Sequence, residues 1–310
     1  MKVLKKLFIA GIIASFFSPF LTSCGNGEGN GEGEDGDTTD VADNGGGLTK
    51  SNGKAQNIFY AIPSPIELAQ LIQRAGAAYN KELLNNPNDA GKYMTNTSKA
   101  LNLGVYGADL SYTSVFDDNT QESILFLAAT RKLAEQLGVG NAFDEKTVDR
   151  IQANTGKKDS LLGIISDSYM TTDEMLKESQ RENASSLVIA GGFIEALYLG
   201  TQLAKTSKNP ADIVQRIAEQ KGTLDNVVGL LSSYEQDAGV AAILVDVKAL
   251  KEIYDQVKVE TKTAAEAKTN PNTKVTTIAG KITYTMGQDL VDKLTAKSAE
   301  IRTKIISGNN

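Results

Sequence analysis

Residues 187–203 are apolar on nearly every face of a helix, and Glu195 is their only charged residue. A helix without a solvated face must be surrounded by other elements, because it would otherwise expose its apolar side chains to water. The segment is shorter than the roughly 20 apolar residues that span a bilayer, and a carboxylate interrupts it. We therefore expect it to be the buried central helix of a helical bundle.

The remainder of residues 58–306 also has mainly helical periodicity. Caps and breaks predict helices over residues 64–85, 89–117, 120–137, a short one from 144, then 160–169, 172–205, 210–234, 239–257 and 288–306. The pattern leaves open whether two of the helices between 160 and 234 are each divided. Residues 274–285 alternate and are rich in β-branched side chains. The predicted fold is mainly all-α, an antiparallel helical bundle with a small β-hairpin or arm near 274–285.

The N-terminus has the pattern of a secretory signal, with lysines ahead of an apolar stretch too short to span a bilayer. Leu21-Thr22-Ser23-Cys24 resembles the lipobox of bacterial lipoproteins, in which the cysteine becomes the first mature residue and carries the lipid. The resemblance implies a signal peptide over 1–23 and a lipid, including palmitate-type acyl chains, on Cys24. The chain has no second cysteine with which to form a disulfide.

Sorting of bacterial lipoproteins depends on the residues after the cysteine, where aspartate commonly retains the protein in the inner membrane. Gly25 and Asn26 occupy these places, so the resemblance implies lipid anchoring in the outer membrane. A run of acidic residues without a basic one follows, which resembles the surface-export signals of some Bacteroidota lipoproteins. A plain solvated spacer explains that run equally well. The periplasmic face and the cell surface therefore both stay open.

Glycine and like charges predict that residues 24–57 form an extended, disordered tether behind the lipidated cysteine. Residues 58–306 then form the helical domain, as one bundle or as two packed sub-bundles. The formal net charge of the chain is −6, and no concentrated basic face is evident, so nucleic acid is not an expected partner. The expected partners are the membrane, through the lipid on Cys24, and another envelope protein.

Two stretches, Phe59-Tyr60-Ala61-Ile62-Pro63-Ser64-Pro65-Ile66-Glu67 and Leu101-Asn102-Leu103-Gly104-Val105-Tyr106-Gly107-Ala108-Asp109-Leu110-Ser111-Tyr112, are similar to those of a family of uncharacterised helical exported proteins and lipoproteins of Bacteroidota. The resemblance implies a helical exported domain and brings no activity with it. The first stretch is also explained as the capped start of a helix.

Small residues recur at helical spacing in two segments, at Gly104 and Ala108 and at Gly192, Ala196 and Gly200. Such spacing lets two helix backbones approach closely. We expect these residues to mark where the central helix meets its neighbour.

Asp109 and Glu195 are the carboxylates most expected to be buried, because each lies among apolar and small residues. A buried carboxylate needs a partner, since leaving it unpaired costs several kcal/mol. The main interpretation is a salt bridge or a tyrosine hydrogen bond in the core. The alternative is a polar pocket lined by Tyr106, Tyr112 or Tyr198, in which the two carboxylates act as acid and base if they face each other.

The chain contains no histidine, which excludes Ser-His-Asp and Cys-His catalysis and histidine-bound zinc or haem. Lipidation of Cys24 removes thiolate chemistry, and no phosphate-binding loop or dinucleotide motif is present. We therefore predict no catalytic, cofactor-binding or metal-binding residues, and a protein that is not an enzyme. The leading hypothesis is a membrane-tethered binding or scaffold protein. The alternatives are a carrier of a small or lipid-like ligand between its helices and a carboxylate-dependent hydrolase.

Overall fold

The computed structural model describes residues 73, 76–116, 120–262, 267–269, 276–278 and 281–308. The predicted signal peptide, Cys24, the predicted tether and nearly all of the predicted helix over 64–85 lie outside the described residues. Everything below concerns the described part of the chain, which belongs to one compact unit.

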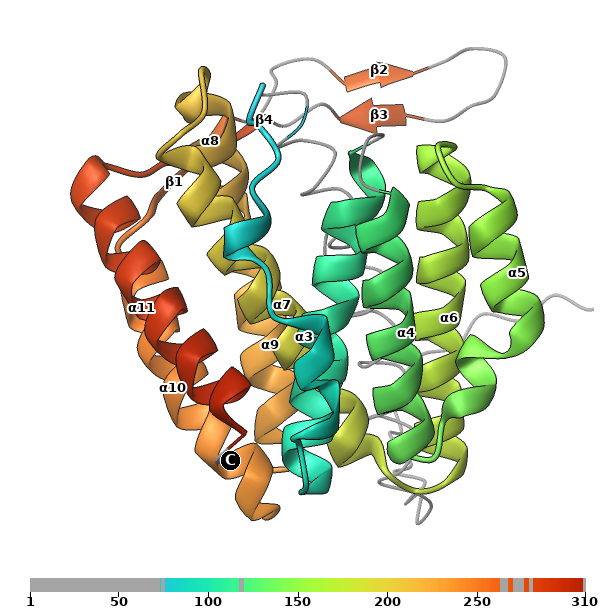
Figure 1. The fold of residues 1–310 in the computed structure, drawn as a ribbon. Helices are drawn as coiled ribbons and strands as arrows, with labels where there is room; N and C mark the ends of the chain where they lie inside the picture. Colours follow the sequence, from blue (N-terminus) through green and yellow to red (C-terminus); the bar gives the residue numbers. More distant parts are fainter. Residues whose placement is uncertain are drawn as a thin grey trace, which may run out of the picture. The chain divides into compact units, whose positions relative to one another are not determined.

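The described chain is mainly helical, which confirms the predicted fold class (Figure 1). Two short 3-10 turns, η1 (Lys81–Leu83) and η2 (Pro87–Gly91), come first, and a third, η3 (Gly140–Phe143), follows the second helix. The helices are α3 (Asn96–Val115), α4 (Thr120–Gln136), α5 (Glu145–Ala153), α6 (Lys158–Glu178), α7 (Glu182–Ala204), α8 (Pro210–Glu219), α9 (Lys221–Ser232), α10 (Ala238–Tyr254) and α11 (Gln288–Ser307).

Helix α7 is the centre of the bundle, as the apolar segment 187–203 predicts. It packs most extensively against α3 and α11 and also meets α6, α8, α9 and α10. By length and composition α7 could cross a membrane, so the sequence-based judgement that it is too short is wrong. However, 83% of its apolar window is buried within the bundle, as expected for the core helix of a folded domain.

Several predicted helix ends are confirmed. Helix α4 ends just before Gly138, whose φ of +79° suits glycine, and α5 starts after Asp144, whose Oδ1 accepts the Thr147 N–H at 2.8 Å. The signals at Gly138 and Asp144 are local, so the sequence alone reveals them. The sequence left open whether the helix over 210–234 is divided, and the structure divides it into α8 and α9.

Other predicted ends are wrong. The helix predicted over 64–85 has ended by Gly76, at φ +73°, so Tyr79 and Leu83 lie outside it. The second helix is predicted to start at residue 89, but Pro87–Gly91 form only the 3-10 turn η2, and α3 begins later with a capping box between Thr95 and Ser98. The break predicted between 169 and 172 is absent, because α6 continues to Glu178.

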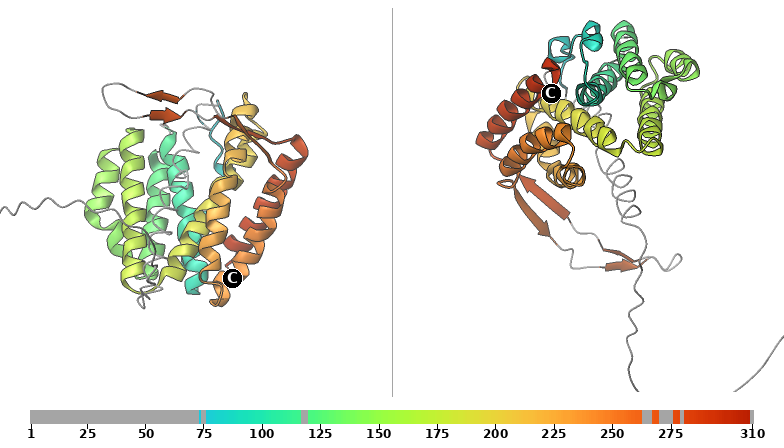
Figure 2. Two further views of the ribbon diagram at one scale, coloured as in Figure 1. Left: turned by 180° about the vertical axis from the view of Figure 1, so that it is seen from behind. Right: turned by 90° about the horizontal axis from the view of Figure 1, so that it is seen from below.

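The predicted β-arm is confirmed and is longer than expected. Strand β1 (Lys258–Lys262) pairs antiparallel with β4 (Lys281–Thr285), and β2 (Ala267–Thr269) pairs with β3 (Thr276–Ile278). The ribbon lies beside the helices (Figure 2). The sequence missed β1 and β2, because few apolar residues mark them.

Glycine brings α3 and α7 into direct backbone contact. A Cβ atom added at Gly104 would lie 2.0 Å from the Val188 carbonyl oxygen, and one added at Gly191 would lie 2.0 Å from the Leu101 carbonyl oxygen. A Cβ at Gly192 would lie 3.4 Å from the Gly104 oxygen, an ordinary contact. The expected close approach is therefore confirmed at Gly104, but on α7 the closest glycine is Gly191 rather than Gly192.

An irregular segment that we call the strap, residues 77–95, precedes α3 and runs along the bundle (Figure 1, cyan). Side chains from the helices hold its backbone at intervals. Tyr112 accepts the Asn80 N–H at 3.0 Å, and Tyr106 donates to the Asn86 carbonyl at 2.6 Å. The strap thus replaces the second half of the predicted first helix.

Candidate functional site

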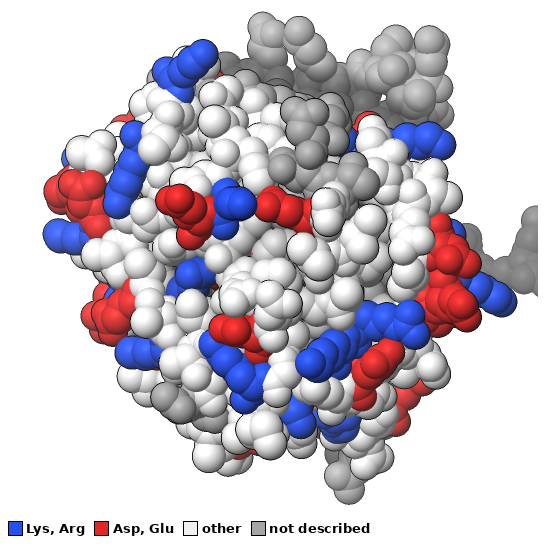
Figure 3. Space-filling model, in the orientation of Figure 1, with Lys and Arg blue, Asp and Glu red and all other residues white. Residues whose placement is uncertain are grey.

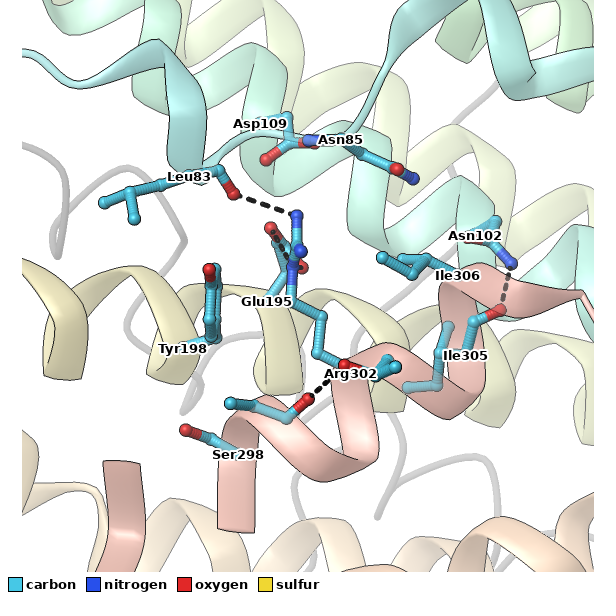
Figure 4. Close-up of polar contacts among 12 residues, drawn as sticks. Leu83, Asn85, Asn102, Asp109, Glu195, Tyr198, Ser298, Arg302, Ile305 and Ile306 are labelled. Carbon is cyan, nitrogen blue, oxygen red and sulfur yellow. Dashed lines mark hydrogen bonds and ion pairs between the residues drawn. The ribbon is translucent and has the colours of Figure 1, made fainter. Parts of the chain in front are cut away.

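Three charged side chains from three helices meet in the interior: Asp109 of α3, Glu195 of α7 and Arg302 of α11 (Figure 4). Arg302 Nε donates to the two Glu195 oxygens at 2.7 and 3.0 Å, and a terminal nitrogen donates to the Leu83 carbonyl of the strap at 2.9 Å. The Tyr198 ring lies 4.3 Å from the guanidinium carbon, within the range of a cation–π contact. We call Asp109, Glu195 and Arg302 the charged cluster.

The two carboxylates of the charged cluster are fully buried, each with 0% of its surface exposed. Asp109 Oδ2 accepts the Asn85 N–H of the strap at 3.1 Å, whereas its Oδ1 has no hydrogen-bond donor among the described residues. Glu195 is the neighbour of Asp109 across the α3–α7 contact. The structure therefore brings the two predicted carboxylates together.

Burial raises the pKa of Asp109 well above its usual range, and the negative charge of Glu195 raises it further, while Arg302 opposes both effects. Burial also raises the pKa of Glu195, but here the contact with Arg302 opposes the shift directly. Burial by itself lowers the pKa of Arg302, yet the carboxylates outweigh this and raise it. Arg302 therefore stays charged, and its main ion-pair partner is Glu195.

The three predicted tyrosines do not line one pocket. Only Tyr198 lies against the charged cluster, through its contact with Arg302. Tyr106 and Tyr112 are buried and hold the strap backbone instead. Burial raises the pKa of Tyr112 to about 12, although the Asn80 N–H opposes the shift. These phenols serve as neutral hydrogen-bonding groups at physiological pH.

Arg302 is the important residue that the sequence reasoning missed. It lies on α11 beside Ile301 and one turn before Ile305, so this arginine is part of the buried face of an amphipathic helix. An arginine at such a position needs an internal anion, and this pattern could have signalled it. The strap residues Leu83 and Asn85 carried no signal, because they contribute backbone groups.

The arrangement suits a structural ion cluster, since its carboxylates do not reach solvent and all three helices contribute to it. Elsewhere, a hollow of about 20 Å³ lies between α3, α4, α5 and α6, which is room for about one water molecule. Among the described residues no group of three or more acidic or cysteine side chains could hold a metal ion.

No known protein family matches this chain, and neither does a curated protein or a solved structure. The resemblances to bacterial lipoproteins and to helical exported proteins of Bacteroidota therefore stay predictions.

Proposed function

We propose that this protein is a lipid-anchored helical protein of the bacterial outer membrane that acts by binding or organising another envelope protein. The lipobox-like Leu21-Thr22-Ser23-Cys24 supports the lipid anchor, and Gly25 and Asn26 support the outer membrane. The bundle presents its outer surface to the partner, at the periplasmic face or at the cell surface.

The observation that carries this proposal is the closure of the charged cluster. Catalysis by Asp109 and Glu195 would require that substrate and water reach them, yet both are fully buried and held by internal partners. A carrier of a drug-sized ligand would require a cavity of roughly 300 Å³ or more. The hollow between α3 and α6 has room for about one water molecule and does not support that alternative.

Exposed apolar side chains supply candidate contact surface. On the helices and the strap they are Met94, Ile124, Leu125 and Val245, with exposures of 78%, 41%, 47% and 68%. On the β1–β4 ribbon, Val259 is 43% and Ile282 is 53% exposed, and the strand register places both on one face. By contrast, the face in Figure 3 intersperses acidic and basic residues, which does not favour an extended anionic partner such as nucleic acid.

Membrane fractionation tests the anchor. The Cys24→Ala variant should leave the membrane fraction or fail to mature, because the lipid on Cys24 is proposed to be the attachment. Persistence of this variant in membranes after high-salt and carbonate washing would contradict the anchor.

Photo-crosslinking in intact cells tests the binding function. A photoreactive residue at Ile282 should give a discrete crosslink to one envelope protein, identified by mass spectrometry. Thr285 on the opposite face of the ribbon is the matched control, since it is also exposed. Additional probes at Val245 and Ile124 would examine the helical surfaces.

Absence of crosslinks at all of these exposed positions would count against a binding protein. A Glu195→Gln variant that folds and localises normally but cannot replace the wild-type protein in cells would instead favour the hydrolase.

A further inference from the structure

The charged cluster contains two carboxyl groups and one guanidinium group in the protein interior. Arg302 is already committed, because its Nε binds both Glu195 oxygens and a terminal nitrogen binds the Leu83 carbonyl. Asp109 Oδ2 accepts the Asn85 N–H at 3.1 Å. Its buried Oδ1 has no donor among the described residues.

If both carboxyl groups were ionised, the cluster would hold an uncompensated negative charge out of reach of water. An unpaired buried charge is strongly unfavourable, and adjacent carboxylates repel each other. Two carboxylate oxygens also cannot form a hydrogen bond with each other unless a proton lies between them. Asp109 and Glu195 are nevertheless close enough for the charge of Glu195 to act on Asp109.

We infer that Asp109 is a neutral carboxylic acid in the folded protein at neutral pH and that it donates its Oδ1 proton to Glu195. This proton makes the buried cluster neutral overall and supplies the partner that Oδ1 lacks. Asp109 Oδ2 then serves as the acceptor for the Asn85 N–H, so one buried proton helps to hold the strap on α3.

The environment favours Asp109 over Glu195 as the proton carrier. Burial and the Glu195 charge both raise the pKa of Asp109, whereas direct contact with Arg302 opposes the rise for Glu195. The other titratable side chains that interact electrostatically with Asp109, besides Arg302, are the tyrosines Tyr79, Tyr106, Tyr112, Tyr169 and Tyr198. Burial raises the pKa of each phenol, so all of them stay neutral at neutral pH.

The stability of the fold should therefore depend on pH in a defined direction. In the unfolded chain Asp109 loses its proton near pH 4, whereas in the folded protein it keeps the proton to higher pH. The folded state binds more protons in that interval, so the contribution of Asp109 is fully present below about pH 4 and is lost as the pH rises through the raised pKa. Ionisation draws water toward the cluster and loosens the strap between Leu83 and Asn86.

Asp109→Asn in the full mature chain tests the inference, because the amide mimics the protonated acid. Its Nδ2 replaces the O–H as a donor to Glu195, and its oxygen still accepts the Asn85 N–H. We expect the urea midpoint of Asp109→Asn to equal that of the wild type near pH 4 and to exceed it increasingly as the pH rises through neutral, because only the wild type must keep a proton in order to fold. Amide exchange in the strap should also accelerate with pH by more than the intrinsic increase in the wild type. In Asp109→Asn it should follow the intrinsic increase alone.

Asp173→Asn is the matched control. Asp173 is also buried, at 6% exposure, but it accepts hydrogen bonds from Lys177 and from the Ser185 hydroxyl, each at 2.5 Å, so both of its oxygens have donors. The same substitution there should lower the urea midpoint at neutral pH. A fall in the midpoint of Asp109→Asn as large as that of Asp173→Asn would overturn the inference.

Two further measurements keep the inference falsifiable if Asp109→Asn folds poorly. Infrared spectra of the wild type at neutral pH should contain the carbonyl stretch of a buried protonated carboxyl group, and its absence would refute the proton. Glu195→Gln should be less stable than Asp109→Asn, because it removes the ion pair with Arg302. The opposite order would place the proton on Glu195.

Discussion

The contact between α3 and α7 changes character along its length. Near Gly104 and Gly191 the two backbones touch, and no side chain lies between them. Further along both helices, at Asp109 and Glu195, the contact consists of carboxyl groups that Arg302 of α11 completes. The first region depends on shape and the second on charge.

The two regions therefore fail in different ways. Close-packed backbones gain from many dispersion contacts and do not tolerate an added atom, because neither helix can yield without the other. A buried ion pair contributes little net stability compared with an apolar contact, but removal of one partner leaves a stranded charge. An added side-chain atom should disrupt the glycine contact, and removal of one charged side chain should disrupt the charged cluster.

The largest effect is expected for Arg302→Met, which removes the counter-charge of Glu195. We expect a loss of about 3–5 kcal/mol in the free energy of unfolding, because a buried carboxylate is left unpaired. Urea denaturation measures this change. Lys304→Met on the same helix is the control, since its ion pairs with Asp246 and Glu300 are partly exposed to solvent and exposed pairs contribute about 1 kcal/mol or less. Equal losses in the two variants would mean that the charged cluster is no more important than a surface ion pair.

An intermediate effect is expected for Gly191→Ala, whose new Cβ would meet the Leu101 carbonyl oxygen at 2.0 Å. Because backbone lies on both sides, we expect a loss of about 1–3 kcal/mol or more. Gly192→Ala, one residue on, should be close to neutral, since its Cβ meets only an ordinary contact.

Gly163→Ala on α6 is the control for helix propensity, because nothing lies within 4 Å of its Cβ. It should stabilise the protein by up to about 1 kcal/mol. In thermal denaturation, Gly191→Ala should have the lowest midpoint, Gly192→Ala an intermediate one and Gly163→Ala the highest. Similar midpoints for Gly191→Ala and Gly163→Ala would disprove the backbone contact.

The smallest effect is expected for Tyr106→Phe, which deletes the hydrogen bond to the Asn86 carbonyl of the strap. A neutral hydrogen bond contributes about 1 kcal/mol, and hydrogen–deuterium exchange should show faster exchange within residues 80–90. Tyr254→Phe deletes a similar bond, to the Ile217 carbonyl, far along the chain from the strap. If both variants changed strap exchange equally, Tyr106 would have no local role.

Local signals account for what could be predicted about the fold. The end of α4 at Gly138 and the start of α5 after Asp144 rest on backbone conformation and capping within a few residues. The helical spacing of Tyr79 and Leu83 wrongly predicts helix in the strap, because Tyr112 of α3 holds the Asn80 N–H and Arg302 of α11 holds the Leu83 carbonyl. Long-range contacts of this kind override periodicity and leave no mark within the segment.

The sequence by itself indicated that α7 is buried together with Glu195, because a helix without a polar face must be surrounded by apolar groups, whereas its burial inside the helical bundle follows from the packing. It also limited the available chemistry, since the chain has no histidine. Only the tertiary structure decided that Glu195 meets Asp109 and pairs with Arg302, 107 residues further along the chain. The pairing of charges depends on which helices become neighbours in space, and that is a property of the packed bundle rather than of any one segment.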